Sequence, residues 1–428
     1  MPPRHVLLVT VDTLRADHLS AYLYLRPTTS LAGLPAFDGT PLAHDIDGLA
    51  DAGVVFAHAY APRGQTFPSL ATLMTGVPPF AHGAVQNRDV LDASATTLAE
   101  AFAERGFVTL GVTTNELLVE ASGIAQGFER FAHFGDGDKD RAATEELVLL
   151  VRRARAESPE RPIFAWLHLM GPHLPYDPQP LGGVDPAAHF TDPGYAGPAD
   201  GSREFLDAAY RNSRPLTPED RHHVVALYDG EVARVNHLVA LLLQAVAAEP
   251  GSAGGSLLDE TLVVFTADHG EELAERHGYW AHSRSVHDSV LHVPLVLRHP
   301  PSLTGRRVLA ETVELQDVAP TLLEWFGIPV PEPVRGRSLL PLVDTYVERP
   351  FASRPAFGQW NDRIFTARDA RWRLVWNPDG VEPDDPPAGP YPVPPLALYD
   401  HEHDPREQRD VAAEHPRVVE RLQRAIVD

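Results

Sequence analysis

The run His5-Val6-Leu7-Leu8-Val9-Thr10-Val11 is apolar, rich in β-branched residues, and followed by Asp12. An unbroken run of this kind is typical of a central strand in a parallel sheet, which is buried on both faces. Residues 262–267 have the same character and are followed by Asp268. Up to about residue 345, such strand patterns alternate with helical ones. The sequence therefore predicts an α/β fold with a mostly parallel central sheet and helices on both faces.

With 428 residues, the chain exceeds what a single core usually organises, so a second, smaller domain is expected. Residues 1–345 are predicted to form the main α/β domain. Residues 346–428 are predicted to form a small C-terminal α+β subdomain, because paired strand patterns precede a closing helix at 411–427. Residues 177–218 contain many Pro, Gly and Asp residues and little periodicity. We interpret them as a long irregular insertion that lies over a pocket.

The formal net charge is −23, and Lys139 is the one lysine of the chain. An acidic protein of this kind is not expected to bind nucleic acid or an anionic membrane. The chain has no cysteine, which excludes disulfides, thiolate metal sites and cysteine nucleophiles. The first apolar run is too short for a membrane helix and no cleavage site follows it, so a cytoplasmic protein is expected unless a leader has been trimmed. The oligomeric state is left open.

Polar side chains stand where the predicted strands end. If these strands are parallel neighbours, the side chains meet at the carboxyl edge of the sheet, where open α/β folds place their sites. The residues in question are Asp12, Asn115, His168, His173, Asp268 and His269.

Thr66 belongs to a loop that leads into a helix, in the stretch Gly64-Gln65-Thr66-Phe67-Pro68. Pro68 suits a first helical turn, Thr66 suits the N-cap before it, and Gly76 can end the helix. A hydroxyl at a helix N-terminus lies beside unpaired N–H groups, where an anion binds and an attacking oxygen is stabilised. Taken alone, Thr66 would be interpreted as a helix cap. Beside the strand-end residues it is predicted to be the nucleophile.

Asp12, Asp268, His269 and the Thr66 hydroxyl together offer oxygen and nitrogen ligands for one divalent cation. Such a cation lowers the pKa of a coordinated hydroxyl and screens an incoming anion. Asn115 could then hold a non-bridging oxygen of the substrate. The metal is left open between Mn, Zn, Mg and Ca. No convincing Asp-x-x-x-His pair indicates a second metal, so one is expected.

Several motifs occur in an order shared with one known family. They are Val11-Asp12-Thr13-Leu14-Arg15-Ala16-Asp17, Thr66-Phe67-Pro68-Ser69, Pro172-His173-Leu174-Pro175-Tyr176, Thr266-Ala267-Asp268-His269-Gly270-Glu271 and Leu291-His292-Val293-Pro294-Leu295. Together they resemble the sulfatase family of the alkaline phosphatase superfamily, from residue 5 to about residue 420. The resemblance implies an alkaline-phosphatase-like sandwich with a smaller C-terminal domain that contains β-structure.

The resemblance also implies roles for single residues. Asp12, Asp268 and His269 match metal ligands, and Thr66 matches the nucleophile. His173 and His282 match contacts to the substrate anion or the leaving group, and either could protonate the leaving oxygen. We also predict substrate contacts from Asn115, His168, His173 and Arg15.

The chain departs from the sulfatase pattern at the nucleophile. Sulfatases carry a Cys or Ser there, which becomes formylglycine, followed by Pro-Ser-Arg. This chain has Thr66, which cannot give that aldehyde, and Leu70 in place of the arginine. Thr13 stands where a second aspartate is usual, and the two substrate-binding lysines are absent. A threonine with a nearby asparagine, here Asn115, resembles instead the phosphoesterases of the superfamily, such as nucleotide pyrophosphatase/phosphodiesterases and lipoteichoic acid synthases.

We therefore predict a metal-dependent hydrolase of small-molecule phosphate esters (phosphodiester, phosphomonoester or phosphonate ester), which acts through Thr66 and a covalent phosphothreonine. The first alternative is a sulfuric ester hydrolase without formylglycine, because sulfate esters carry one charge and the site has few cations. The second alternative is a non-catalytic binding protein on a sulfatase frame, suggested by Leu70 and the missing lysines.

Overall fold

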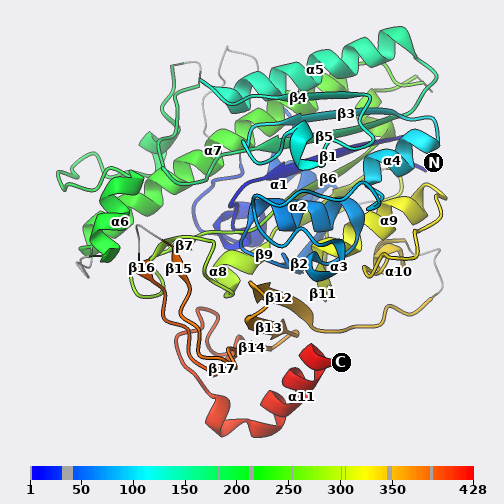
Figure 1. Ribbon diagram of the computed structural model, residues 1–428. Coiled ribbons are helices and arrows are strands. Elements are labelled where there is room, and N and C mark those ends of the chain that lie inside the picture. The colour runs from blue at the N-terminus through cyan, green and yellow to red at the C-terminus, as the bar shows by residue number, and fades with distance from the viewer. Residues whose placement is uncertain are drawn as a thin grey trace.

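A nine-stranded sheet forms the centre of the protein, with the strand order β11-β2-β10-β6-β1-β5-β3-β4 and with β9 paired to β2 (Figure 1). The computed structural model describes residues 2–30, 42–181, 183–211, 216–252, 254–299, 301–303, 305–344, 349–385 and 389–428. The strands of this sheet are β1 (His5–Val11), β2 (Val54–Tyr60), β3 (Val108–Thr113), β4 (Arg130–His133), β5 (Ile163–Leu169), β6 (Thr261–Ala267), β9 (His292–Val293), β10 (Leu295–Arg298) and β11 (Arg307–Glu314). The predicted α/β fold with a mostly parallel sheet is confirmed.

The register at the centre of the sheet brings the strand ends together. β1 runs parallel to both β5 and β6, with Val11 opposite Leu169 and Ala267. All residues of these three strands are buried, as expected for a strand covered on both faces. β10 runs antiparallel to its neighbours β6 and β2. The residues that follow Val11 and Ala267 therefore emerge side by side at one edge.

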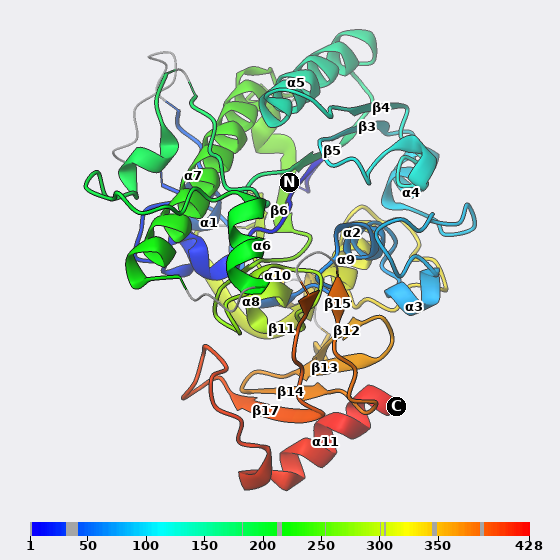
Figure 2. The ribbon, with the colours of Figure 1, turned by 60° about the vertical axis from the view of Figure 1, so that its left-hand side comes forward.

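Helices cover both faces of the sheet (Figures 1 and 2). One face carries α5 (Lys139–Glu157) and α7 (Pro218–Ala248), and the other carries α2 (Thr66–Thr75), α4 (Leu98–Glu104) and α9 (Val318–Trp325). By length and composition α7 could cross a membrane, but 72% of its most apolar window is buried inside the protein, as in a core helix. The shorter helices are α1 (Ile46–Asp51), α3 (Pro79–His82), α6 (Arg203–Arg211), α8 (Asp288–Leu291) and α10 (Leu340–Val343).

The C-terminal part forms an antiparallel sheet in the order β12-β13-β14-β17, on which α11 (Pro416–Val427) packs. Its strands are β12 (Ala356–Trp360), β13 (Ile364–Arg368), β14 (Trp372–Trp376) and β17 (Leu396–Asp400). It has a core of its own around Leu374, Leu398 and Leu422. The two-residue strands are β7 (Glu272–Leu273), β8 (Trp280–Ala281), β15 (Asp384–Asp385) and β16 (Gly389–Pro390). The predicted domain boundary, between residues 345 and 346, lies outside the described residues.

Two parts of the chain differ from the prediction. The strand expected at 293–297 is divided into β9 and β10, because Pro294 has no N–H to give to a neighbouring strand. The insertion at 177–218 is not wholly irregular, since it contains the short 3-10 helix Pro186–His189 and the nine-residue helix α6. Leu206 of α6 is fully buried, which explains why this helix forms despite the weak periodicity of its sequence.

Candidate active site

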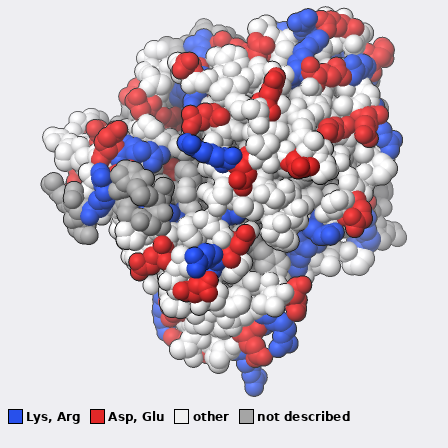
Figure 3. All heavy atoms as spheres, viewed as in Figure 1, with Lys and Arg blue, Asp and Glu red and all other residues white. Residues whose placement is uncertain are grey.

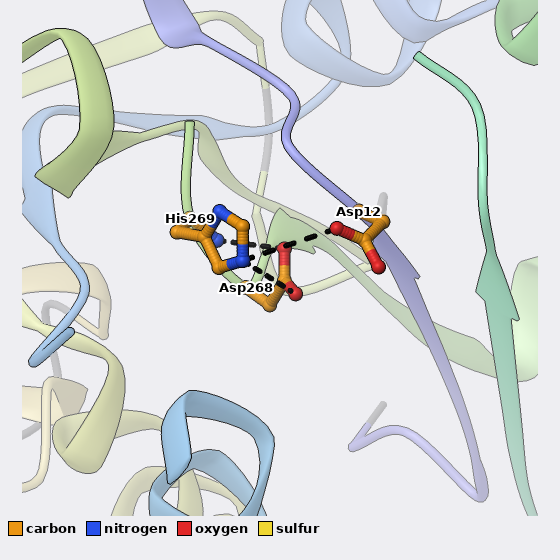
Figure 4. Close-up of side chains that lie close together, drawn as sticks. All are labelled: Asp12, Asp268 and His269. Atoms are coloured by element: carbon orange, nitrogen blue, oxygen red, sulfur yellow. Dashed lines mark hydrogen bonds and ion pairs between the residues drawn. The ribbon is translucent and has the colours of Figure 1, made fainter. Parts of the chain in front are cut away.

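Asp12, Asp268 and His269 lie together at the carboxyl edge of the sheet (Figure 4). Their metal-ligand atoms all lie within 4.8 Å of one another. His269 Nε2 is 3.4 Å from Asp268 Oδ2 and 3.9 Å from Asp12 Oδ1. All three side chains are fully buried. Asp12 follows β1 and Asp268 follows the parallel strand β6, so the predicted meeting of these residues is confirmed.

The three side chains fit a divalent cation. Asp12 Oδ1 and Asp268 Oδ2 are buried without a hydrogen-bond partner. Burial and the charge of Asp12 raise the pKa of Asp268. Burial opposes ionisation of Asp12 as well, but neighbouring histidines outweigh it and lower the pKa of Asp12. A cation between the carboxylates would satisfy both orphaned oxygens and offset their repulsion, and the Asp-Asp-His donor set suits several divalent metals.

His269 is held in the tautomer that a metal ligand requires. Its Nδ1 donates to the Gly270 carbonyl at 2.9 Å, so the lone pair is on Nε2. That nitrogen faces Asp12, Asp268 and Thr66. The turn after β1 that completes this edge is strained, because Thr13 has a φ of 55°, and its N–H donates to Asp268 Oδ1 at 3.2 Å.

The Thr66 hydroxyl faces the same group. Thr66 Oγ1 is 3.4 Å from Asp12 Oδ2 and 3.5 Å from His269 Nε2. The prediction that Thr66 is the N-cap is wrong: Gln65 is the N-cap and Thr66 is the first residue of α2. The helix starts earlier than expected because Pro68 still falls in the first turn, where its missing N–H is not needed. The predicted end at Gly76 is confirmed, with a φ of 71°.

Two glycines let the Thr66 loop and the metal-ligand turn pack against one segment. A Cβ on Gly64 would lie 2.5 Å from Val290 Cγ1 and 3.1 Å from the His282 carbonyl oxygen. A Cβ on Gly270 would lie 2.3 Å from the Ser289 carbonyl oxygen. A side chain at either position would push the two parts of the site apart. Residues 282–290 thus support both the nucleophile loop and the metal ligands.

Asn115 and His168 both lie against Asp12. Asn115 Nδ2 donates to Asp12 Oδ2 at 2.6 Å, so one of its two amide hydrogens is already used. His168 Nε2 is 3.6 Å from the same oxygen, and its Nδ1 is 2.9 Å from Thr10 Oγ1. This geometry favours support of Asp12 by His168 over the predicted contact with a substrate. The second amide hydrogen of Asn115 can still donate to a substrate oxygen, as predicted.

His173 and His282 lie on the other side of His269. Their ring centroids are 5.0 Å apart, and the His282 ring is 4.4 Å from the His269 ring. His282 Nδ1 is 2.7 Å from Glu271 Oε1, and burial raises the pKa of Glu271 to about 7. Glu271 belongs to the motif Thr266-Ala267-Asp268-His269-Gly270-Glu271, but its place in the sequence does not predict a role. Nothing in the sequence spacing connects it to His282, because the loop between them sets the pairing.

Arg15 does not join the site, contrary to the prediction. Its guanidinium donates to Asp17, to Glu275 and to the Glu271 carbonyl. It lines a separate cavity of about 1100 Å³, whose walls include none of the three metal-ligand candidates. In the described part of the chain, no arginine or lysine forms an ion pair with Asp12 or Asp268. On the face shown in Figure 3, basic side chains are interspersed with acidic ones.

The chain is similar to known proteins along most of its length. A family model described as Sulfatase matches residues 4–328. Arylsulfatase K of Xenopus laevis is 22% identical over 468 residues, which cover 96% of this chain and 81% of that protein. The solved structure of a 2-O GAG sulfatase is similar with a TM-score of 0.73 and 19% identity, covering 100% of this chain and 91% of that one. The phosphonate monoester hydrolase of Agrobacterium radiobacter has a TM-score of 0.70 and 22% identity, covering 98% and 93%.

Proposed function

Because this chain belongs to the sulfatase family of hydrolases, we propose that it cleaves monoanionic esters, and sulfate esters first among them, with Thr66 as the attacking residue. The observation that carries the proposal is the position of Thr66 Oγ1, within 3.5 Å of both Asp12 and His269. The similarity to an arylsulfatase along most of the chain supports a sulfate ester at least as well as the phosphate ester predicted from the sequence.

The charge of the site supports a substrate with a single negative charge. Asp12 and Asp268 already bring two carboxylates, and one divalent cation would only balance them. No guanidinium or ammonium group among the described residues is paired with these carboxylates. A sulfate ester carries one negative charge, whereas a phosphate monoester carries close to two at neutral pH. No positively charged side chain among the described residues beside Thr66 would balance the second negative charge of a phosphate monoester. A monoanionic ester therefore fits the site better than a dianionic one.

Members of the sulfatase family are generally metal-dependent. A divalent metal bound by Asp12, Asp268 and His269 would lower the pKa of the Thr66 hydroxyl and screen the charge of the ester. Asn115 holds Asp12 in place through its 2.6 Å hydrogen bond. The nucleophilic attack and the proton transfers are then carried out by side chains of the protein.

Thr66 Oγ1 gives its proton to water and attacks sulfur in line with the leaving oxygen, so that an O–S bond to threonine forms as the O–S bond to the alcohol breaks. His282 gives a proton to the leaving oxygen and Glu271 orients His282 through Nδ1. His282, which has given up its proton, then takes a proton from a water molecule that attacks sulfur. The O–S bond to Thr66 breaks, sulfate leaves, and the Thr66 oxygen takes up a proton from water to restore the hydroxyl. His173, on the same side, lines the space that the leaving group would occupy.

A second candidate is the hydrolysis of phosphonate monoesters or phosphodiesters, which also carry one negative charge. It is supported by the similarity to the phosphonate monoester hydrolase fold and by the threonine and asparagine beside Asp12. The same chain groups would act at phosphorus instead of sulfur, through a phosphothreonine.

Four esters of 4-nitrophenol test the proposal, because their common leaving group isolates the anionic head. They are the sulfate, the phenylphosphonate, the bis-phosphate diester and the phosphate monoester, each assayed with Mn, Mg, Ca and Zn. We expect kcat/KM to be highest for the sulfate and lowest for the phosphate monoester. Preferential cleavage of the monoester would contradict the charge argument. A metal-free protein that cleaves none of them would favour a binding function.

A further inference from the structure

The insertion returns to the active site at α6. The N–H of Tyr176, just after His173, donates to the Gly201 carbonyl at 3.0 Å. A Cβ on Gly201, whose φ is +72°, would lie 2.5 Å from the Tyr176 carbonyl oxygen, so the two segments are in close contact. Arg203, two residues later, is the first residue of α6. It therefore begins the helix beside the segment that carries His173.

Helix α6 is fixed in this position from two sides. It packs against β8, which directly precedes His282, and Leu206 is fully buried. At its other end, the Tyr210 hydroxyl donates to the Pro390 carbonyl at 2.6 Å, which places α6 beside β16 (Figure 1). The Tyr210 ring also lies 5.3 Å from the Tyr279 ring. The backbone of Arg203 thus has a defined place next to His173 and His282.

Arg203 is an exposed cation with no hydrogen bond or ion pair to another described residue. Two other exposed arginines, Arg141 and Arg153, are paired with Glu145 and Glu157. The positive charge of Arg203 affects the pKa values of His173 and Glu271. Burial lowers the pKa of His173 and Arg203 lowers it further, whereas burial raises the pKa of Glu271 and Arg203 opposes that rise. The charge therefore acts on the side of the proposed leaving group.

We propose that Arg203 binds a second anionic group carried by the leaving group, so that the preferred substrate is an ester of an alcohol that also bears a carboxylate or sulfate. This inference rests on the proposed ester hydrolysis and names its substrate class. The anionic group of the ester itself would lie beside Thr66 and the metal ligands. Arg203 would therefore contact a different anionic group of the substrate. Its planar guanidinium matches the paired oxygens of either anion. On a protein of net charge −23, an unpaired arginine here gives local attraction for an anionic substrate.

The test compares 4-nitrophenyl sulfate with 3-carboxy-4-nitrophenyl sulfate, which adds one anion to the leaving group. Arg203→Gln should lower kcat/KM for the carboxylated ester about tenfold, mainly through KM, and for the plain ester less than about twofold. Arg211→Gln, at the other end of α6, removes the same charge and should change neither value. Equal losses on both esters, or no loss on either, would overturn the proposal.

Binding of the two free phenols by calorimetry gives a readout that does not need turnover. Wild-type protein should bind 3-carboxy-4-nitrophenol about tenfold more tightly than 4-nitrophenol, and Arg203→Gln should remove this difference. If the wild type cleaves neither sulfate, the proposed sulfatase function fails, while the binding result still decides the role of Arg203. Equal binding of the two phenols by the wild type would contradict it.

Discussion

The two sides of Thr66 are built from different kinds of structure. On the metal side, Asp12 and Asp268-His269 follow parallel strands whose register places Val11 opposite Ala267. On the leaving-group side, His173, His282 and Arg203 come from a loop, a segment after a two-residue strand and an insertion helix. In the proposed reaction, the central sheet would therefore determine the chemistry at the anionic group of the ester, whereas loops and the insertion would determine which alcohol leaves.

The largest effect is expected on the metal side, from Asp268→Asn. It should remove bound metal and lower turnover about a thousandfold or more, because metal stabilisation of the transition state contributes several kcal/mol. It should also raise the melting temperature of the metal-free protein, because burial and the charge of Asp12 disfavour an ionised carboxyl at this position and asparagine is neutral. Metal analysis, turnover and thermal melting measure these effects.

The exposed Asp136 offers a matched control for that variant, since Asp136→Asn removes one carboxylate outside the site. It should leave metal content and turnover unchanged. Full metal binding by Asp268→Asn would contradict the assignment of the metal side.

A smaller effect is expected from His282→Asn on the leaving-group side. If His282 protonates the leaving oxygen, kcat should fall about 10²-fold to 10³-fold for phenyl sulfate and less for 4-nitrophenyl sulfate, whose leaving oxygen is less basic. Metal content should stay unchanged. The exposed His403 provides the control variant His403→Asn. Equal losses with both esters would show that His282 does not supply the proton.

The sequence predicts the metal side well, because an apolar run that ends in a carboxylate identifies a strand end in a parallel sheet. Thr66 is found by its helix-start pattern, although that pattern assigns it the wrong helix position. The leaving-group side is harder to predict, because the pairing of Glu271 with His282 and the approach of Arg203 depend on loop paths without periodicity. Arg15 fails as a predicted substrate contact because Asp17, two residues away, and Glu275 bind its guanidinium.

The smallest effect is expected from Glu231→Gln in α7, which lies beside the segment between β5 and His173, 3.1 Å from the position of a Cβ on Gly171. Burial raises the pKa of Glu231 to about 8, from an ordinary value of 4.5. A raised pKa in the folded state gives stability that is complete below 4.5 and is lost as the pH rises through about 8. The melting temperature of the wild type should therefore fall by more than that of Glu231→Gln between pH 5 and pH 9.

That measurement separates the two sides, because Glu231 lies beside Gly171, near His173, and not beside the metal ligands. Metal content should be the same in both proteins. An equal pH dependence of melting in the two proteins would show that Glu231 is not buried in its neutral form.

The central claim is that the Thr66 hydroxyl is the attacking group beside a metal held by Asp12, Asp268 and His269. The most direct measurement is turnover of 4-nitrophenyl sulfate by Thr66→Ala, with its metal content determined on the same sample and Thr66→Ser, which keeps a hydroxyl, as the matched control. We predict that Thr66→Ala keeps its metal and loses turnover, while Thr66→Ser retains measurable turnover. Wild-type turnover by metal-loaded Thr66→Ala would contradict the claim.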